Sequence, residues 1–284
     1  MGMAFLRYRR WLRTADKLYT YASLGLVTVF VLLPFFWILS TSLKPESETF
    51  KFPVQWIPGK PTIAAYVEMW SHRPYGIYLL NSAFVALASM LIAVTVSSMS
   101  AYGLSRFRFR GSNWVLLAMM GTQMVPPMLL LISYFKVMSA AGLFDTLWAL
   151  IITYTAYLLP FSVWIMKGYL DTIPVDLDEA ALIDGCSPGN VFWRVILPVI
   201  LPGIVATAIF SFLLAWNEFT FAYVLTSSDK RYTIGVGIAY LFGEYSVAWN
   251  ELMAAGMVAS LPPILLFFFA SKYLISGLTA GALK

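Results

Sequence analysis

Long uncharged apolar segments alternate with shorter polar segments along most of this chain. The segment from Leu18 to Leu43 contains no charged residue and exceeds the roughly 20 residues that a transmembrane helix needs. Further apolar segments of comparable length follow it: Leu79–Leu104, Trp114–Phe135, Thr146–Met166, Pro202–Leu225 and Glu251–Ser271. The pattern therefore predicts an all-α protein, built as a polytopic bundle of six transmembrane helices.

The composition agrees with a membrane protein and excludes an ordinary soluble enzyme. Charged residues make up 12% of the chain, about half the charged fraction of soluble domains. The net charge of +5 would suit binding either to nucleic acid or to a membrane surface. The distribution of the basic residues along the chain decides between the two. A single cysteine, Cys186, excludes an internal disulfide. The sequence has no glycine-rich phosphate-binding loop of the Walker type, so any ATP has to be hydrolysed by another chain.

Basic residues indicate how the chain is oriented in the membrane. Six spans place both termini on one side, and twelve of the 19 Lys and Arg residues lie on that side. Cytoplasmic loops carry an excess of Lys and Arg, so this side is the cytoplasm. We therefore expect a cytoplasmic amphipathic tail over residues 1–17, a six-helix transmembrane domain over 18–276 and a cytoplasmic tail over 277–284. A nucleic-acid-binding arm is disfavoured, because residues 1–17 run directly into an apolar span.

One long polar interruption, residues 167–199, separates the fourth span from the fifth. We expect two short helices that lie on the membrane surface. Pro174 opens the first and Gly185 ends it in a left-handed conformation. Ser187, as N-cap, and Pro188 begin the second. The loop is rich in acidic residues, which favours docking into a basic socket on a partner: Asp171, Asp176, Asp178, Glu179 and Asp184.

A fixed pattern of residues occupies this loop: Glu179-Ala180-Ala181, three residues, Gly185, nine residues and then Val195-Ile196-Leu197-Pro198. It resembles the signature of ATP-binding-cassette importer permeases, and departs from it at Val195, where isoleucine is usual. The resemblance implies the type I importer permease fold, with the loop as a coupling helix that docks in a cleft of a cytoplasmic ATPase. An ordinary re-entry loop is the alternative. The implied coupling residues are Glu179, Ala180, Ala181, Asp184, Gly185, Leu197 and Pro198.

The resemblance also implies partners and a location. They are a second permease subunit that completes a heterodimer, an ATPase dimer that binds ATP and Mg, an extracytoplasmic sugar-binding protein and membrane lipid, with no nucleic acid. This chain itself would be no enzyme and would bind no cofactor and no metal. It would lie in the cytoplasmic (inner) membrane of a bacterium or archaeon, with both termini in the cytoplasm.

Polar residues inside the predicted spans are candidates for a substrate pathway. Trp216, Asn217 and Glu218 lie in the fifth span, where an ionisable residue usually faces a cavity or the bundle interior. The three residues either line or gate a polar pathway, or else Asn217 and Glu218 bond neighbouring helices near the outer interface. Gln123 and Tyr154 are further candidates, although bonding between helices is the commoner role of such residues.

Later stretches resemble the carbohydrate branch of the family. Gly243, Glu244 and Tyr245 lie before the sixth span and resemble an outward loop of sugar permeases, which would face the binding protein. We therefore predict the membrane subunit of an importer for a di- or oligosaccharide. The alternative is a stand-alone secondary transporter or channel driven by an ion gradient. Against it, Glu218 is nearly alone as a charge within a span, and no internal repeat is evident.

Overall fold

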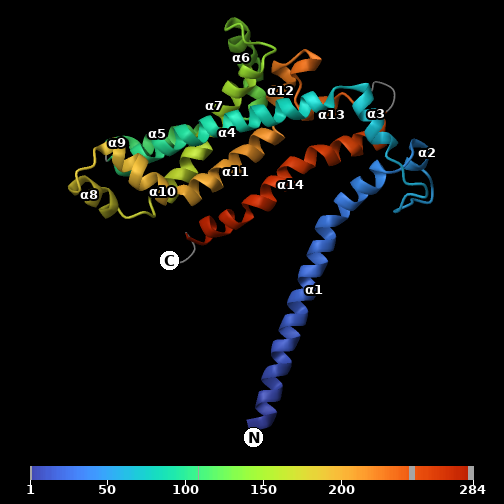
Figure 1. Cartoon of the computed structure of the whole chain (residues 1–284), viewed down its shortest axis with the longest axis horizontal. Helices are drawn as coiled ribbons and strands as arrows, with labels where there is room; N and C mark the ends of the chain where they lie inside the picture. Colours follow the sequence, from blue (N-terminus) through green and yellow to red (C-terminus); the bar gives the residue numbers. More distant parts are fainter. Residues whose placement is uncertain (1, 108, 243–246, 281–284) are drawn as a thin grey trace. The chain divides into compact units, whose positions relative to one another are not determined.

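The structure is a computed structural model that describes the backbone of residues 2–107, 109–242 and 247–280 (Figure 1). Side chains are described for residues 16–107, 109–242 and 247–270. Within these residues the chain is helical, and its extended pairing is limited to one bridge between Phe242 and Val247. The all-α prediction is therefore confirmed. The helices in chain order are α1 (Gly2–Ser42), α2 (Glu46–Thr49), α3 (Ala64–His72), α4 (Tyr75–Arg106), α5 (Ser112–Thr122), α6 (Pro127–Ala140), α7 (Leu147–Leu170), α8 (Asp176–Ile183), α9 (Pro188–Asn190), η1 (Val191–Ile196), α10 (Leu197–Val199), α11 (Leu201–Asn217), α12 (Thr220–Leu225), η2 (Asp229–Arg231), α13 (Ile234–Ala239) and α14 (Trp249–Ala280).

The helices account for the predicted spans in two ways. In the described residues, four helices are long and apolar enough to cross a membrane unaided: Asp16–Ser42 of α1, α4, α7 and Trp249–Ala270 of α14. Two bent pairs bring the number to six if each pair forms one span. These pairs are α5 with α6, bent by 94°, and Pro188–Val199 with α11, bent by 76°.

The third predicted span, Trp114–Phe135, is wrong as a continuous helix. α5 ends at Thr122, and α6 begins with Pro127 at its first turn. Pro126 has an extended ψ of 128°, because a residue that precedes a proline is pushed out of the helical region. The proline pair therefore breaks the span, whereas a single proline inside α7, Pro160, leaves that helix continuous.

The fifth predicted span, Pro202–Leu225, is also interrupted. α11 ends at Asn217, and Glu218 has an extended conformation with a ψ of 122°. α12 then starts at Thr220. Glu218 therefore lies in a break between two helices and not in a helical turn.

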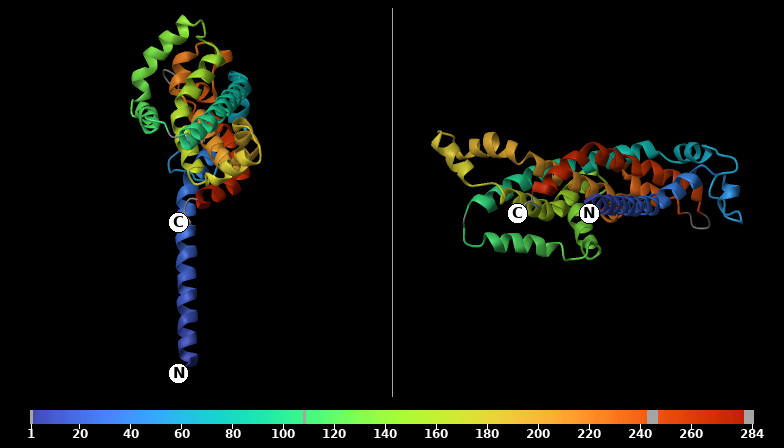
Figure 2. Two further views of the ribbon diagram at one scale, coloured as in Figure 1. Left: turned by 90° about the vertical axis from the view of Figure 1, so that its left-hand side faces the viewer. Right: turned by 90° about the horizontal axis from the view of Figure 1, so that it is seen from below.

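The chain forms two compact units, of which one comprises residues 73–240 and 259–284. In this unit α4, α7 and α11 pack along one another, as Figure 2 shows. The buried face of α4 consists largely of small residues, which allow helix backbones to approach closely. These small residues are Ser82, Ala86, Ser89, Ala93, Ser97, Ser98 and Ala101.

The other unit comprises residues 1–72 and 241–258. Lys44 is fully buried there. Two contacts compensate for the burial of its charge: its Nζ donates to the carbonyl oxygen of Gln55 at 2.6 Å and lies 4.3 Å from the centre of the Trp37 ring. His72 is the last residue of α3. Its Nδ1 lies 3.3 Å from Oε2 of Glu251, although its side chain is 62% exposed.

The expected tails merge with the terminal helices. α1 runs without a break from Gly2 to Ser42, so no helix boundary falls at residue 17. α14 continues to Ala280, past the expected boundary at residue 276. The assignment of these tails to the cytoplasm stays a prediction.

Candidate functional site

Local sequence explains why α8 forms in the polar loop. Its first turn carries Asp176, Asp178 and Glu179, and negative charge is favourable at the positive end of a helix dipole. The chain enters the helix from Pro174 and Val175, whose carbonyl oxygens accept from later backbone N–H groups. The prediction that Pro174 opens this helix is confirmed to within two residues.

Gly185 ends α8 as predicted. Its φ is +87°, in the left-handed region that glycine adopts without steric cost. Its N–H donates to the carbonyl oxygen of Leu182, and the N–H of Cys186 donates to that of Ala181, each at 3.0 Å. These two bonds form a Schellman motif, which satisfies carbonyl groups that would otherwise lack a donor.

The second half of the loop is one bent path of short helices. Ser187 has extended dihedrals and Pro188 occupies the first helical position, as predicted, although the Ser187 hydroxyl makes no capping bond. The chain widens into the π-helical η1 before Pro198. In a regular α-helix the ring of Pro198 would clash with the carbonyl group four residues earlier, that of Arg194. The wider π-helical turn relieves this clash.

α8 turns one face toward the core of its own unit. Ala181 is 6% exposed and packs in a cluster with Leu170 of α7 and with Val191 and Ile196 of η1. Its small side chain therefore lets α8 approach the end of α7. This differs from the expectation that both alanines serve a partner, because of the two only Ala180 is exposed.

The opposite face of α8 is exposed and mixes acidic with apolar groups. Ile183 is 86% exposed and Leu182 is 47% exposed. Among the predicted coupling residues, Leu197 is half-buried, and the following are exposed: Glu179, Ala180, Asp184, Gly185 and Pro198. α8 therefore has an exposed face that this unit leaves uncovered.

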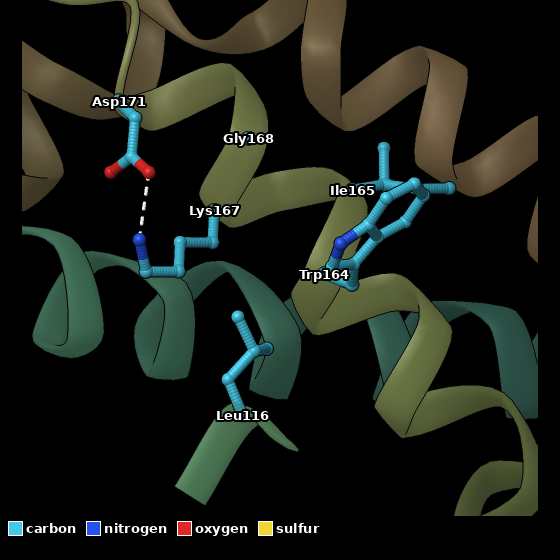
Figure 3. A pocket seen from close by; sticks show the side chains of 6 residues that line it. All are labelled: Leu116, Trp164, Ile165, Lys167, Gly168 and Asp171. Atoms are coloured by element: carbon cyan, nitrogen blue, oxygen red, sulfur yellow. Dashed lines mark hydrogen bonds and ion pairs between the residues drawn. The ribbon is translucent and has the colours of Figure 1, made fainter. Parts of the chain in front are cut away.

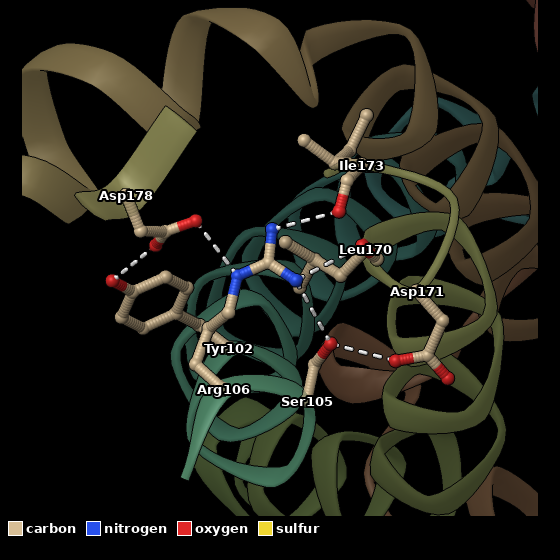
Figure 4. A network of polar contacts seen from close by, with 7 residues as sticks. All are labelled: Tyr102, Ser105, Arg106, Leu170, Asp171, Ile173 and Asp178. Atoms are coloured by element: carbon tan, nitrogen blue, oxygen red, sulfur yellow. Dashed lines mark hydrogen bonds and ion pairs between the residues drawn. The ribbon is translucent and has the colours of Figure 1, made fainter. Parts of the chain in front are cut away.

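A buried ion pair, which the sequence did not reveal, joins α8 to α4. Nε of Arg106 donates to Oδ2 of Asp178 at 2.9 Å, with the two side chains 7% and 9% exposed (Figure 4). The hydroxyl group of Tyr102 donates to Oδ1 of Asp178 at 2.8 Å. The two partners lie 72 positions apart along the chain, so no local pattern connects them.

The same guanidinium group also binds the end of α7 and the segment that follows it. Its Nη2 donates to the carbonyl oxygen of Ile173 at 3.2 Å, and its Nη1 lies 3.5 Å from that of Leu170. The last carbonyl groups of a helix have no partner within the helix and carry partial negative charge. Arg106 therefore joins the ends of α4 and α7 to α8.

A second carboxylate, Asp171, lies beside this network. It accepts from the hydroxyl group of Ser105 at 2.6 Å and from Nζ of Lys167 at 2.7 Å. Partial burial raises the pKa of Asp171, but the hydrogen bonds from Lys167 and Ser105 outweigh it and hold the pKa below its ordinary value. The carboxylate is therefore charged at neutral pH.

A cavity of about 330 Å³ adjoins the ion pair of Lys167 and Asp171, as Figure 3 shows. The indole ring of Trp164 forms another part of its wall. The remaining lining residues are Leu116, Ile165 and Gly168.

Two of the candidate pathway residues are buried in contacts between helices. Trp216 is 7% exposed, and its indole N–H donates to the carbonyl oxygen of Ala259 in α14 at 3.1 Å. The hydroxyl group of Tyr154, which is 1% exposed, donates to the carbonyl oxygen of Glu218 at 3.2 Å. Tyr154 therefore has the bonding role that is commoner for such residues, and Trp216 joins α11 to α14.

The other pathway candidates have different environments. The Glu218 carboxylate accepts from the backbone N–H of Phe221 at 2.9 Å and caps α12. Gln123, in the break between α5 and α6, donates to the carbonyl oxygen of Tyr157 in α7 at 2.9 Å. Asn217 is exposed, and its amide donates to its own helix at Leu213. Whether these residues line a pathway stays a prediction. The docking candidates Gly243, Glu244 and Tyr245 lie outside the described residues.

Comparison with known families decides what kind of protein carries this loop. Residues 93–279 match the family model described as "Binding-protein-dependent transport system inner membrane component". The chain belongs to this family. It is therefore a membrane component of a transport system and not an enzyme, and α8 is the coupling helix of the family's signature loop.

Individual members of the family cover almost the whole chain. "Inner membrane ABC transporter permease protein YcjP" of Escherichia coli is 34% identical, over 96% of this chain and 98% of that protein. "Trehalose/maltose transport system permease protein MalG" of Thermococcus litoralis is 36% identical, over 91% of this chain and 94% of that protein.

Solved structures share the fold. A chain from a crystal structure of a bacterial ABC transporter, involved in the import of the acidic polysaccharide alginate, superimposes with a TM-score of 0.77. It is 19% identical and the match covers 92% of this chain and 96% of that one. The predicted importer permease fold is thereby confirmed.

Proposed function

We propose that this chain is one of two membrane subunits of an ATP-driven importer for a carbohydrate of two or more sugar units. An extracytoplasmic binding protein delivers the sugar. The substrate class follows from the names of relatives: the Thermococcus litoralis protein is named for trehalose and maltose, and the structural neighbour belongs to an alginate importer. The observation that carries the coupling part of the proposal is the exposed, Schellman-capped α8.

The exposed face of α8 is the part of this chain that we assign to the ATPase. Its carboxylates, Glu179 and Asp184, provide negative charge. Gly185 has no side chain and lets the partner approach the backbone closely, and Ile183 provides an apolar anchor. ATP and Mg bind on the ATPase dimer. Its closure draws the coupling helices of the two membrane subunits together and opens the pathway toward the binding protein. The energy comes from the different affinities of the partners for the two states of the membrane subunits.

The orientation follows from the distribution of basic residues. Loops with excess Lys and Arg face the cytoplasm, and this supports our assignment of both termini and α8 to that side of the membrane. The loop that contains Gly243, Glu244 and Tyr245 then faces the binding protein. Among the pathway candidates Asn217 is the one whose side chain is exposed, and we assign it to contact with the sugar.

Affinity purification of the tagged chain after gentle extraction, followed by mass spectrometry, tests this proposal. We expect an ATPase and a second, related permease to co-purify. The variant Ile183→Asp should lose the ATPase and keep the second permease, because it buries an unpaired charge in the proposed contact.

A matched control uses another exposed isoleucine on the segment assigned to the opposite side. Ile63 is 66% exposed, and the variant Ile63→Asp should keep both partners. Full recovery of the ATPase with Ile183→Asp would overturn the assignment of α8. Recovery of the wild-type chain without any ATPase would overturn the importer proposal itself.

A further inference from the structure

One turn at the end of α4 binds two carboxylates of the polar loop, those of Asp171 and Asp178. Tyr102, Ser105 and Arg106 are spaced by three and four residues, so their side chains lie on one face of the helix. Tyr102 and Arg106 bind Asp178 in α8, and Ser105 binds Asp171 at the end of α7, as Figure 4 shows.

The guanidinium group of Arg106 is held on every side. Each of its three nitrogens donates to an acceptor, and these acceptors belong to α8, to the last residue of α7, to Ile173 in the segment between these helices and to α4 itself. A buried charge is tolerated when it is paired and its remaining donors are satisfied. The planar fork of arginine permits this set of bonds, which the single ammonium group of lysine cannot reproduce.

Packing supports the same junction from the apolar side. The ring of Tyr102 lies 5.0 Å from that of Phe192 in η1, between centres. Ala101 shares a core with Leu170 and Ala181, in the elements that the polar network joins. Tyr102 therefore contacts α8 through its hydroxyl group and η1 through its ring.

α8 needs such a junction because it is short. It has eight residues, and isolated helices of this length are marginal in water. Asp171 to Val175 connects it to α7 as a non-helical segment. A force applied to the exposed face of α8 would bend this segment unless another contact carried the force onward.

We propose that Arg106 is a positioning residue for transport. It fixes the coupling helix to the ends of α4 and α7, so that a displacement of α8 moves these two helices and is not absorbed by residues 171–175. This inference rests on the proposed docking of α8 to an ATPase. Arg106 itself touches neither the substrate nor the nucleotide.

Hydrogen exchange, followed at the backbone amides of this chain, measures how firmly the junction holds α8. The protein is purified with whatever subunits accompany it, as wild type and as the variants Arg106→Lys, Asp178→Asn and Tyr102→Phe. We expect backbone amides of residues 177–185 to exchange at least about tenfold faster in the first two variants, as α8 opens locally. Tyr102→Phe keeps the ring packing and should give a smaller increase.

A nearby ion pair supplies the control. Lys167→Gln removes the half-buried partner that lies four residues before Asp171, and it leaves Arg106 and Asp178 in place. It should not change exchange in residues 177–185. Exchange that stays at the wild-type rate in Arg106→Lys and Asp178→Asn would overturn the proposal, whether or not an ATPase co-purifies.

Coupling is measured in reconstituted complexes that contain the ATPase and the loaded binding protein. With Arg106→Lys, uptake per complex should fall about tenfold, within the usual range of coupling energies, while ATP hydrolysis per complex changes little. The number of ATP molecules hydrolysed per sugar therefore rises. A purely structural role predicts fewer assembled complexes with an unchanged ratio of ATP to sugar, and this result would overturn the proposal.

Discussion

Cys186 donates its backbone N–H to the carbonyl oxygen of Ala181 at 3.0 Å, and this bond closes the end of the coupling helix. The contact spans the residues that turn the chain away from the helix axis. It requires Gly185, between the two, to adopt a φ of +87°. The shape of the exposed end of α8 therefore depends on one glycine.

Replacing Gly185 tests this shape. A Cβ at this position meets nothing within 4 Å, so the cost within the chain comes from the left-handed backbone alone. For Gly185→Val we expect about 1–2 kcal/mol of strain and loss of uptake, with sugar binding by the soluble protein intact. Gly185→Asn tolerates the left-handed conformation and should retain more uptake than Gly185→Val. Normal uptake with Gly185→Val would count against the coupling assignment.

Gly203 is needed for close packing at the start of α11. A Cβ there would lie 2.6 Å from the ring of Tyr169, so the ring or the helix has to shift. We expect Gly203→Ala to destabilise the protein by about 1–3 kcal/mol, measured as a lower midpoint of thermal unfolding in detergent. Gly168→Ala is the control, because a Cβ there meets nothing within 4 Å and alanine favours a helix. Equal midpoints for Gly203→Ala and wild type would refute this packing.

Asp145 joins two loops. It has a φ of +59°, and its Oδ1 accepts from the backbone N–H groups of Ser227 at 2.8 Å and Ser228 at 3.0 Å. Burial raises its pKa, but these hydrogen bonds outweigh burial and lower the pKa below the ordinary 3.8. Its stabilisation is therefore complete above pH 3.8 and is lost as the pH falls through the lower folded pKa.

Two variants separate the charge of Asp145 from its geometry. We expect Asp145→Ala to cost about 1.5–3 kcal/mol at neutral pH, because it removes a charged acceptor. Asp145→Asn keeps an acceptor and tolerates the left-handed conformation, so it should cost less. The deficit of Asp145→Ala should be constant between pH 5 and 8, and a deficit that changes within this window would contradict the lowered pKa.

Glu218 illustrates how far the sequence predicts the site. Its position within an apolar segment marked it as unusual, but its role as a helix cap depends on the break that follows Asn217. We expect Glu218→Ala to destabilise α12 by about 0.5–2 kcal/mol, seen as faster hydrogen exchange in residues 220–225. Glu218→Gln keeps one acceptor and should change the exchange less. A variant in which exchange slows would contradict the capping role.

The local features of α8 could be predicted because they depend on near neighbours. Gly185 ends the helix and Pro188 begins the next one through dihedral preferences that act within a few residues. Apolar segment lengths likewise predicted α4 and α7 closely.

Contacts between distant residues could not be predicted in the same way. The pairing of Arg106 with Asp178 needs the packing of three helices, and a single sequence carries no direct signal of it. The break at Pro126 depends on whether surrounding helices satisfy the freed backbone groups, which apolar length alone does not report.

ATP dependence of uptake tests the central claim most directly. The purified complex is reconstituted in vesicles with the binding protein and a radiolabelled oligosaccharide, while ion gradients are dissipated. The account predicts uptake with ATP on the side of α8 and none with a non-hydrolysable analogue. Uptake by this chain alone without ATP, driven by an imposed ion gradient, would contradict the account and favour a secondary transporter.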